Sequence, residues 1–332
     1  MTHHTTLTAG IDTAKDKLDV AIHGLPTHFT VENRQSGWRR LAGALTKAGV
    51  KRVGIEATGG YERGVVGYLR AADFTLLVLQ PLQVKAYARL HLRRAKNDRL
   101  DAVLIAACAA VLDVPRIAPD PRLPPLADVL TVIEQTEEDI ARYKTRLEHI
   151  AQPRLRRLVL ADIKRLGGRR AAELKRLVQA VRRHDDLARR LDLIQSVPGI
   201  GERTALALVL RLPELGRITR EEAAALAGVA PFDDDTGQHH GARRIAGGRS
   251  RVRGSLFAAA LPAAFRWNSA LIALYRRLTA KGKPHKLALI ACARKLVIYA
   301  NTVVARGTPW RLTPGLAAAA DSFPSGQFLC ST

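Results

Sequence analysis

The sequence is short of cysteine, aromatic residues and long apolar runs, and each shortage excludes a class of protein. Three cysteines in 332 residues (Cys108, Cys292 and Cys330), with no CxxC pair, argue against both a disulfide framework and a cysteine zinc site. Aromatic residues make up 5% of the chain, so we do not expect base stacking on aromatic side chains to dominate any nucleic-acid binding. No stretch approaches eighteen uninterrupted apolar residues and no signal peptide opens the chain, so we expect no membrane partner.

Acidic residues are also scarce. The chain has 53 Lys and Arg against 30 Asp and Glu, a net charge of +23. A charge of this size favours a polyanionic partner, most simply nucleic acid. With 47% hydrophobic residues the chain is long enough to build cores for two or three domains, and we expect a protein of a reducing compartment.

Residues 1–113 have the pattern of an α/β domain. Strands are predicted at "LTAGID", "KLDVAIHG" and "THFTVEN", followed by a helix over 34–49 and a buried strand at "KRVGIEA". A helix from about 60 to 71, the strand "FTLLVLQ" and helices across 81–112 complete the domain. Early strands joined by tight turns, then strands alternating with helices, predict a mixed sheet flanked by helices.

The middle of the chain, 114–193, shows no strand pattern. It opens with the Pro-rich linker 114–126, continues as a long amphipathic or coiled-coil helix to about residue 150, and ends in a strongly basic helical run from Pro153 to about Leu193. Two interpretations of this helical spacer stand: a solvated connection, or an arm that dimerises or spans DNA.

Residues 194–306 are predicted to be mainly helical. "SVPGIGERTALALV" resembles a helix-hairpin-helix element, in which backbone N–H groups at a helix N-terminus receive a phosphate, although an ordinary Pro-Gly helix start has the same pattern. A loop over 237–250 and helices near 251–266, 269–280 and 284–306 follow. The tail 307–332 is rich in Gly, Pro, Ser and Ala and is expected to be disordered.

Four carboxylates lie at positions that are typical of catalytic residues rather than of a solvated surface. Asp12 ends the first strand, Glu56 ends the strand "VGIE", and Asp98 and Asp101 are three residues apart on a predicted helix, so that they share a face. Such a quartet suits two Mg²⁺ or Mn²⁺ ions, which would stabilise the attacking and leaving oxygens at a phosphodiester. The alternatives Asp16 and Asp19 are expected to be exposed, and a strand-end Asp or a salt-bridged helix pair has a purely structural interpretation as well.

These segments carry a resemblance. "GIDTAKDKLDVAI", "GIEATGGYERGVVGYLRAADFTLLVLQPLQVKAYAR" and "RRAKNDRLDA" look like the N-terminal domain of DEDD insertion-sequence transposases of family one hundred and ten, which are bridge-RNA-guided serine recombinases. The segments "LIQSVPGIGERTALALV", "AALAGVAPF", "GGRSRVRGSLFAAAL" and "RLTAKGKPHKLALIACARKLVIYAN" resemble the C-terminal transposase domain of that family. The resemblance runs in order over about residues 7–306.

The resemblance implies a RuvC-like, RNase H-like N-terminal domain with its D-E-D-D quartet at Asp12, Glu56, Asp98 and Asp101. It implies excision and insertion of a mobile element in double-stranded DNA, directed by a structured non-coding guide RNA that pairs with target and donor. It also implies Mg²⁺, composite active sites in a homo-oligomer (dimer to tetramer), and a bacterial, cytoplasmic, nucleoid-associated protein.

The sequence departs from the family at the nucleophile. Where the family has a serine in an "SG" dipeptide after "APF", this chain has Thr236 followed by Gly237. A threonine hydroxyl is the same kind of nucleophile, but its β-methyl group restricts χ1 and crowds the approach. Three interpretations stand: an active Thr236, an inactive copy, or a nucleophile at Ser250 or Ser255.

The residues after Thr236 favour phosphate contacts over a metal site. Adjacent His239 and His240 diverge and have no third soft ligand near them, so we do not expect zinc there. Asp321 is the only carboxylate after Asp235, so the C-terminal third is almost purely cationic and suited to nucleic-acid phosphates. The expected contacts are Arg243, Arg244, Arg249, Arg251 and Arg253, although a solvated arginine face explains them too.

Two other functions fit the same residues. A metal nuclease that cuts DNA junctions would use the quartet alone, and a decayed transposase copy would bind nucleic acid without catalysis. Covalent capture of DNA on the protein separates a recombinase from a nuclease.

Overall fold

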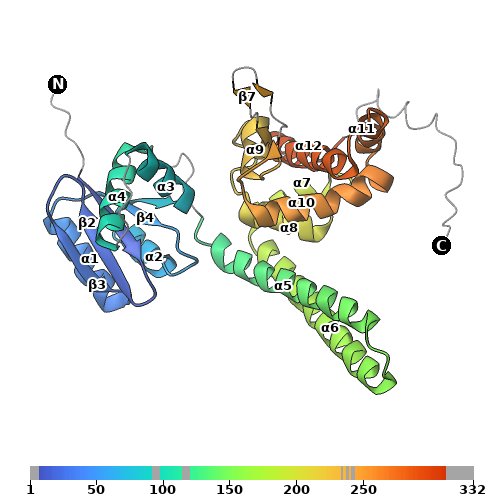
Figure 1. Cartoon of the computed structure of the whole chain (residues 1–332), viewed down its shortest axis with the longest axis horizontal. Helices are drawn as coiled ribbons and strands as arrows, with labels where there is room; N and C mark the ends of the chain where they lie inside the picture. The colour runs from blue at the N-terminus through green and yellow to red at the C-terminus, as the bar shows by residue number, and fades with distance from the viewer. Residues whose placement is uncertain are drawn as a thin grey trace, which may run out of the picture. The chain divides into compact units, whose positions relative to one another are not determined.

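The computed structural model describes residues 7–91, 98–113, 120–232, 235–236, 239–240 and 244–311. These residues fall into two compact units, Met1–Ala118 and Pro119–Thr332, which are described separately. Figure 1 shows a sheet with helices in the first unit and helices almost throughout the second.

The first unit is built on a five-stranded sheet of order β3-β2-β1-β4-β5. β1 (Thr8–Thr13), β2 (Lys17–Ile22) and β3 (His28–Glu32) are antiparallel neighbours, while β4 (Arg52–Glu56) and β5 (Thr75–Leu79) continue from β1 in parallel. This mixed sheet with flanking helices fits the RNase H-like fold that was expected.

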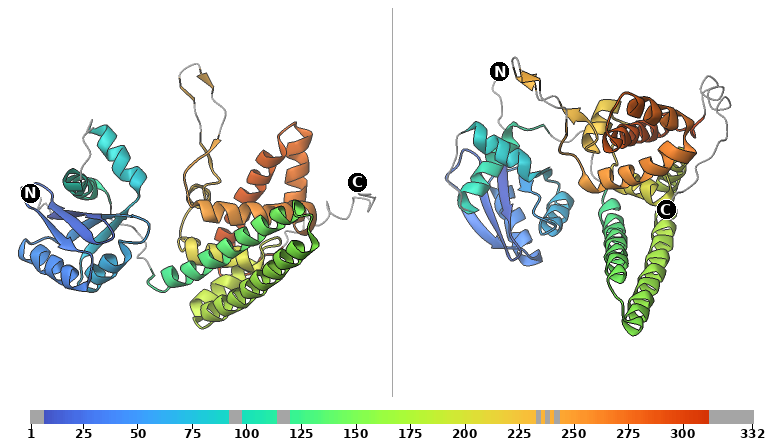
Figure 2. Two further views of the ribbon diagram at one scale, coloured as in Figure 1. Left: turned by 60° about the horizontal axis from the view of Figure 1, so that its bottom comes forward. Right: turned by 45° about the vertical axis from the view of Figure 1, so that its right-hand side comes forward.

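Alternation along the strands assigns the two faces of the sheet. Ile11 and Ile55 are fully buried in one core together with Leu41 of α1 (Gln35–Lys47) and Leu69 of α2 (Arg63–Ala71). The other face is covered by α4 (Asp98–Val111), which packs on β1, β2 and β4, and by α3 (Pro81–Leu90) beside it. In Figures 1 and 2, α1 and α2 lie on one side of the sheet and α3 and α4 on the other.

The second unit begins with a long helical hairpin. α5 (Leu123–Glu148) and α6 (Pro153–Arg182) pack along each other, as Figure 2 shows in green. The basic run was predicted to be one helix to about residue 193, but it breaks at Arg183 and His184, where His184 is extended and precedes α7 (Asp185–Gln195). An ion pair of 2.6 Å between Arg182 and Asp192 joins the two helices across the break.

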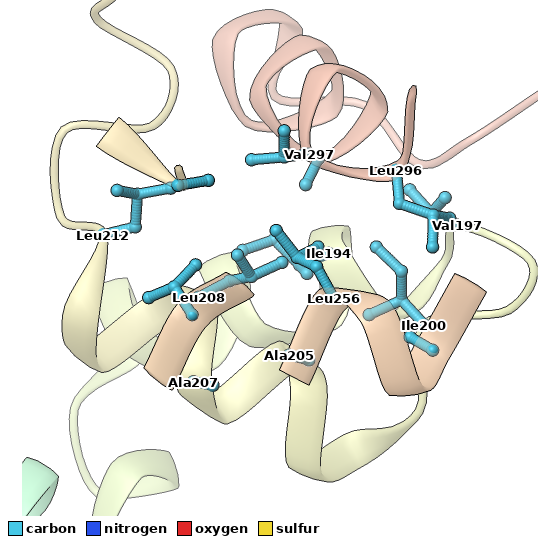
Figure 3. Packing of buried hydrophobic residues seen from close by; sticks show 14 of the residues in the cluster. Ile194, Val197, Ile200, Ala205, Ala207, Leu208, Leu212, Leu256, Leu296 and Val297 are labelled. Carbon is cyan, nitrogen blue, oxygen red and sulfur yellow. The ribbon is translucent and has the colours of Figure 1, made fainter. Parts of the chain in front are cut away.

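The remaining helices surround one apolar core. They are α8 (Glu202–Arg211), α9 (Arg220–Leu226), α10 (Ser250–Pro262) with the π-helical turn Ala263–Trp267, α11 (Ser269–Ala280) and α12 (His285–Arg306). Figure 3 shows Ile194, Leu208, Leu256 and Leu296 converging from α7, α8, α10 and α12. Burial of each such side chain contributes about 1.5–3 kcal/mol to the stability of the fold. Because these side chains come from helices far apart in the sequence, the unit is held together by contacts distant in sequence.

Helix α12 is long and apolar enough to cross a membrane by length and composition, but half of its most apolar window is buried in this core. The bent pair 250–267 and 269–280 would pass the same test only if it formed one span despite an angle of 98°. Burial of this kind is typical of a core helix.

The end of the described chain differs from the disorder expected for 307–332. Gly307 closes α12 in the left-handed region (φ +63°). The backbone N–H of Trp310 then donates to the Ser196 hydroxyl (2.8 Å), and its ring lies 4.4 Å from that of Tyr299. Residues 307–311 are therefore packed onto the unit.

The predicted loop 237–250 also differs from the structure. Its described parts contain two short strands, β8 (His239–His240) and β9 (Arg244–Ile245). β8 pairs with β7 (Asp235–Thr236), and β9 pairs with β6 (Pro231–Phe232), both of which precede the predicted loop. Figures 1 and 2 show the β7–β8 pair projecting away from the helices. We call residues 231–245 the arm.

Candidate active site and nucleic-acid interface

Two of the predicted catalytic carboxylates end neighbouring strands. The parallel pairing of β1 with β4 ends at Ile11 opposite Ile55, so Asp12 and Glu56 follow at the next position of the same register. Both residues are half-buried. The carboxyl ends of two adjacent parallel strands therefore each supply one acid.

Two glycines show which face these acids share. A Cβ on Gly10 would lie 2.2 Å from the backbone N of Ala106, and a Cβ on Gly54 would lie 2.4 Å from the Cβ of Ala109, so only glycine lets α4 approach this closely. Side chains two residues apart on a strand point to the same face. The two strand-end acids therefore lie on the face that α4 covers.

The other two predicted acids belong to α4 itself. Asp98 is its first residue and Asp101 stands one turn later. Asp101 is half-buried and precedes Ala102, whose carbonyl would lie 2.3 Å from a Cβ on Gly10. The side chain of Asp98 lies outside the described residues. The fold thus brings strand-end and helix acids to one face of the sheet.

The acids have the chemistry of a divalent-cation site, but the described residues do not close one. Carboxylate oxygens are the hard ligands that Mg²⁺ and Mn²⁺ prefer. Among the residues whose side chains are described, no three His, Cys, Asp or Glu come close enough together to hold a metal. Asp12, Glu56 and Asp101 each already take part in an interaction. By donor type and by face these residues fit a hard divalent cation.

One neighbouring acid was predicted wrongly. Asp16 is exposed, as expected, but Asp19 is 5% exposed rather than solvated. Asp19 pairs in register with Asp12, and its buried carboxylate is satisfied by Lys17 (3.0 Å) and by the hydroxyl of Thr30 (2.6 Å). The strand alternation in "KLDVAI" places Asp19 beneath α4, a signal that the nearby turn obscured.

The turn after Glu56 is held by a further acid. The carboxylate of Glu62 accepts hydrogen bonds from the backbone N–H groups of Thr58 (3.1 Å) and Gly60 (2.9 Å). Gly59 and Gly60 have φ values of +75° and +114°, a region that favours glycine. Glu62 therefore positions the loop that follows the strand-end acid Glu56.

Thr236, the predicted nucleophile, is the second residue of β7. Its backbone pairs with His239 across the turn of the arm, and Asp235 pairs with His240. The side chains of these four residues lie outside the description, so the structure places the backbone of Thr236 but not its hydroxyl.

The base of the arm is a close contact between glycines. Gly228 and Gly248 both have positive φ (+69° and +65°), and a Cβ on Gly248 would lie 2.3 Å from the backbone N of Gly228. The guanidinium of Arg253 donates to the Gly247 carbonyl (2.8 Å), and the Arg249 N–H donates to the Leu226 carbonyl (2.8 Å). The arm therefore leaves the helices from a fixed base.

Two of the predicted phosphate-binding arginines have carboxylate partners. Arg249 forms two hydrogen bonds with Glu214 (2.5 and 2.7 Å). Arg251 binds Glu134 (2.9 Å), which also holds Arg211 (2.6 Å). The ion pair of Arg203 with Glu137 extends the same region. We call these seven residues the paired arginine cluster.

The carboxyl group of Glu214 shows the effect of its pairing with Arg249. Burial alone would raise the pKa of Glu214, but the hydrogen bonds and the charge of Arg249 outweigh burial and hold the pKa below its ordinary value. Of the other predicted phosphate contacts, Arg244 is exposed on β9, and Arg243 lies outside the described residues.

The alternative nucleophiles lie in an unfavourable place. Ser255 is 4% exposed, and with Ser250 it lines a cavity of about 560 Å³ in which Glu134, Glu137 and Glu138 outnumber Arg203 and Arg251. A phosphodiester approaching either serine would meet these carboxylates. The choice between Thr236 and the two serines stays a prediction.

The helix-hairpin-helix-like turn is packed against the protein. A Cβ on Gly199 would lie 2.3 Å from the Cβ of Ala263, and Val197 and Ile200 are buried. Gly201, the residue before α8, is exposed. The Gly-containing turn therefore has a packing role, and its use as a phosphate site stays a prediction.

Two family models match the chain. A DEDD model of the IS110 type, described as "Transposase", matches residues 9–157, and a model described as "Transposase IS116/IS110/IS902 family" matches residues 191–276. The first match includes all four predicted metal-binding acids, and the second includes Thr236 and the arm.

Similarity to individual proteins agrees with these matches. The chain is 25% identical over 312 residues to the "Pilin gene-inverting protein" of Moraxella bovis, an alignment that covers 91% of this chain and 96% of the relative. The Moraxella lacunata protein of the same name matches to the same extent. Among solved structures, Thermus thermophilus RuvC with a Holliday junction substrate aligns at 16% identity with a TM-score of 0.26, over 31% of this chain and 91% of RuvC.

Proposed function

The chain belongs to the IS110 family of transposases, enzymes that act on DNA, and from that premise we propose a division of the reaction between its two units. The protein would cut and rejoin DNA strands so that a DNA element is excised and inserted. Two relatives named for gene inversion align over almost their whole length, which supports rearrangement of DNA rather than simple degradation.

The observation that carries this proposal is the register of Asp12 and Glu56. They end adjacent parallel strands on the face covered by α4, which bears Asp98 and Asp101. These four residues would hold Mg²⁺ or Mn²⁺, and the bound cation would supply stabilisation of charge on the attacking and leaving oxygens. Asp19 and Glu62 would act as positioning residues, because they fix the strand and the turn beside the acids.

Thr236 would supply the nucleophile. Its hydroxyl loses a proton to a base and attacks phosphorus, so that a Thr–O–P bond forms while one bond from phosphorus to a deoxyribose oxygen breaks. The leaving oxygen takes up a proton. Attack by a deoxyribose hydroxyl of the partner strand then reverses these changes and rejoins DNA. Energy of the phosphodiester is conserved in the covalent link, so strand exchange needs no nucleotide cofactor.

The partners follow from the same family membership. We propose double-stranded DNA as substrate, a structured non-coding RNA as guide and a dimer-to-tetramer assembly acting at the bacterial nucleoid in the cytoplasm. The net charge of +23 supports binding to nucleic acid. If the guide is real, RNA-free protein will not recombine a plasmid carrying the gene and its flanks until a transcript of those flanks is added.

The direct test of the metal site is Asp12→Asn with Asp16→Asn as the matched control. Both replace an acid near the β1–β2 turn by its amide, but Asp16 is exposed and outside the predicted quartet. With Mg²⁺ present, we expect Asp12→Asn to reduce strand cleavage by about a hundredfold or more, because one charge-stabilising group is lost. Asp16→Asn should cleave like the parent. Equal cleavage by all three proteins would contradict the proposal.

A further inference from the structure

A second cluster of cations in the C-terminal unit surrounds a pocket. The cavity has a volume of about 620 Å³ and lies between the base of the arm and the N-terminal half of α12. Its apolar floor includes Pro231 and Ile245 from the arm and Leu287 and Ile290 from α12. We call it the α12 pocket.

Four cations line the α12 pocket, and no Asp or Glu is among the described residues that do. They are Arg244, Lys283, Lys286 and Arg294. Within the described part of the chain, none of the four forms an ion pair with a carboxylate. Four like charges around one cavity repel each other. The charge of Glu221 acts on Arg294, but Glu221 does not line the pocket, so the pocket attracts an anion.

Arg294 adds a second observation to the charge of the pocket. Its Nε is buried and has no hydrogen-bond partner in the structure. A buried donor without an acceptor is unfavourable, and an oxygen bound beside it would relieve this. The nearby carboxylate of Glu221 is already held by Arg220 at 2.6 Å.

The place of the pocket in the chain connects it to the predicted nucleophile. Thr236 follows Pro231 by five residues, so their Cα atoms are at most about 18 Å apart. A DNA strand carries one phosphate per about 3.4 Å of rise. A strand that runs from Thr236 towards the α12 pocket would cover this distance in about five nucleotides.

We infer that the α12 pocket binds an unpaired nucleotide of the DNA strand that is cut. The four cations would bind the phosphates, and the apolar floor would contact the base, which a paired nucleotide keeps stacked inside the duplex. A volume of about 620 Å³ is within the range of small-molecule sites. The inference rests on the proposed function in taking DNA as the strand bound and Thr236 as the residue that attacks it.

Lys286→Gln tests the cationic rim, with Lys295→Gln as the matched control. Both lysines are exposed on α12, but Lys295 is outside the pocket. Binding of the full-length protein to a labelled single-stranded DNA of twelve nucleotides is measured over a series of salt concentrations. We expect Lys286→Gln to weaken binding about tenfold and to lower the salt slope by about 0.7, while Lys295→Gln changes neither by more than about twofold.

Leu287→Gln tests the apolar floor. Leu287 is 46% exposed, so its replacement by a polar residue leaves the core intact. We expect weaker binding of the single strand with an unchanged salt slope, and unchanged binding of the duplex of the same sequence. Equal losses for single strand and duplex would overturn the unpaired nucleotide, and losses confined to the RNA of the same sequence would assign the pocket to RNA instead.

This test is separate from that of the proposed function. Binding needs no catalysis, so Asp12→Asn should keep parental affinity for the single strand. Parental binding by both Lys286→Gln and Leu287→Gln would overturn the inference even if the protein recombines DNA. Loss of binding in both variants would support it even if Asp12→Asn cleaves normally and the proposed metal site is wrong.

Discussion

The C-terminal unit contains two groups of cations that differ in what holds them. In the paired arginine cluster, Glu134 and Glu214 each accept from arginines at 2.5–2.9 Å. Around the α12 pocket, the cations have no carboxylate partner among the described residues, and the Nε of Arg294 is buried without an acceptor. The first group is used to hold helices together, and the second is left available for a ligand.

The contrast shows why net charge does not identify a binding surface. The arginines of "GGRSRVR" were predicted to meet phosphates, yet Arg249 and Arg251 are bound to acids from α5 and from the segment after α8. A nucleic-acid role for them stays a prediction, and it would require these ion pairs to be exchanged for phosphates. Lys283, Lys286 and Arg294 need no such exchange.

The largest effect is expected from removing the charge of Glu134. This side chain is 10% exposed and binds Arg211, which is also 10% exposed, so Glu134→Gln leaves a buried guanidinium without its counter-ion. We expect the free energy of unfolding to fall by about 3–5 kcal/mol in urea. Glu138→Gln, at an exposed position of the same helix, should stay within about 0.5 kcal/mol of the parent. If Glu134→Gln lowers the free energy of unfolding by less than about 1 kcal/mol, the paired arginine cluster does not stabilise the fold, and it no longer differs from the cations of the α12 pocket in this respect.

A smaller effect, with a defined pH dependence, is expected for Glu214→Gln. The folded pKa of Glu214 is lowered from 4.5, so its stabilising contribution is fully present above pH 4.5 and is lost as the pH falls through the folded pKa. At pH 7 the variant should be about 1–3 kcal/mol less stable than the parent. The difference should shrink as the pH falls below about 4.5. A difference independent of pH between 7 and 3 would show that Arg249 does not act through the charge of Glu214.

The smallest effect is expected for Arg251→Gln. Arg251 is 43% exposed, and Glu134 keeps Arg211 when Arg251 is removed. The free energy of unfolding should change by about 1 kcal/mol or less, and the salt slope of single-strand DNA binding should not change. If the slope falls as much as in Lys286→Gln, the paired arginines also bind phosphates, and the contrast between the two groups is lost.

The sheet could be predicted because its information is local. The alternation in "TAGID" and "RVGIE" predicts β1 and β4, and the acid at the end of each strand marks Asp12 and Glu56. The sequence does not indicate that Gly10 and Gly54 allow the close approach of α4. The helix residues that they contact are 50 or more positions away, so this contact is seen only in the structure. Asp19 was assigned to the surface because of the nearby "TAKDK" turn, whereas its own carboxylate is buried and is held by the exposed residues Lys17 and Thr30.

The second unit was less predictable because its partners are distant in sequence. Arg251 and Glu134 are separated by 117 residues, and Arg249 and Glu214 by 35. The arm was assigned to a loop because its strands are only two residues long and are shaped by glycines at its base. The α12 pocket combines residues from the arm with residues of α12, so no local pattern indicates it.

As the proposed nucleophile, Thr236 would become covalently linked to DNA. Trypsin would release residues 221–243 as one peptide in which Thr236 is the only hydroxyl-bearing residue, whereas Ser250 and Ser255 fall in other peptides. The protein is incubated with Mg²⁺, the flanking RNA and DNA carrying the flanks, then digested with trypsin and nuclease and analysed by mass spectrometry. We expect a nucleotide adduct on peptide 221–243 that Thr236→Ser retains and Thr236→Ala abolishes. DNA cleavage without any adduct, or an adduct on the peptide of Ser250 or Ser255, would contradict this account.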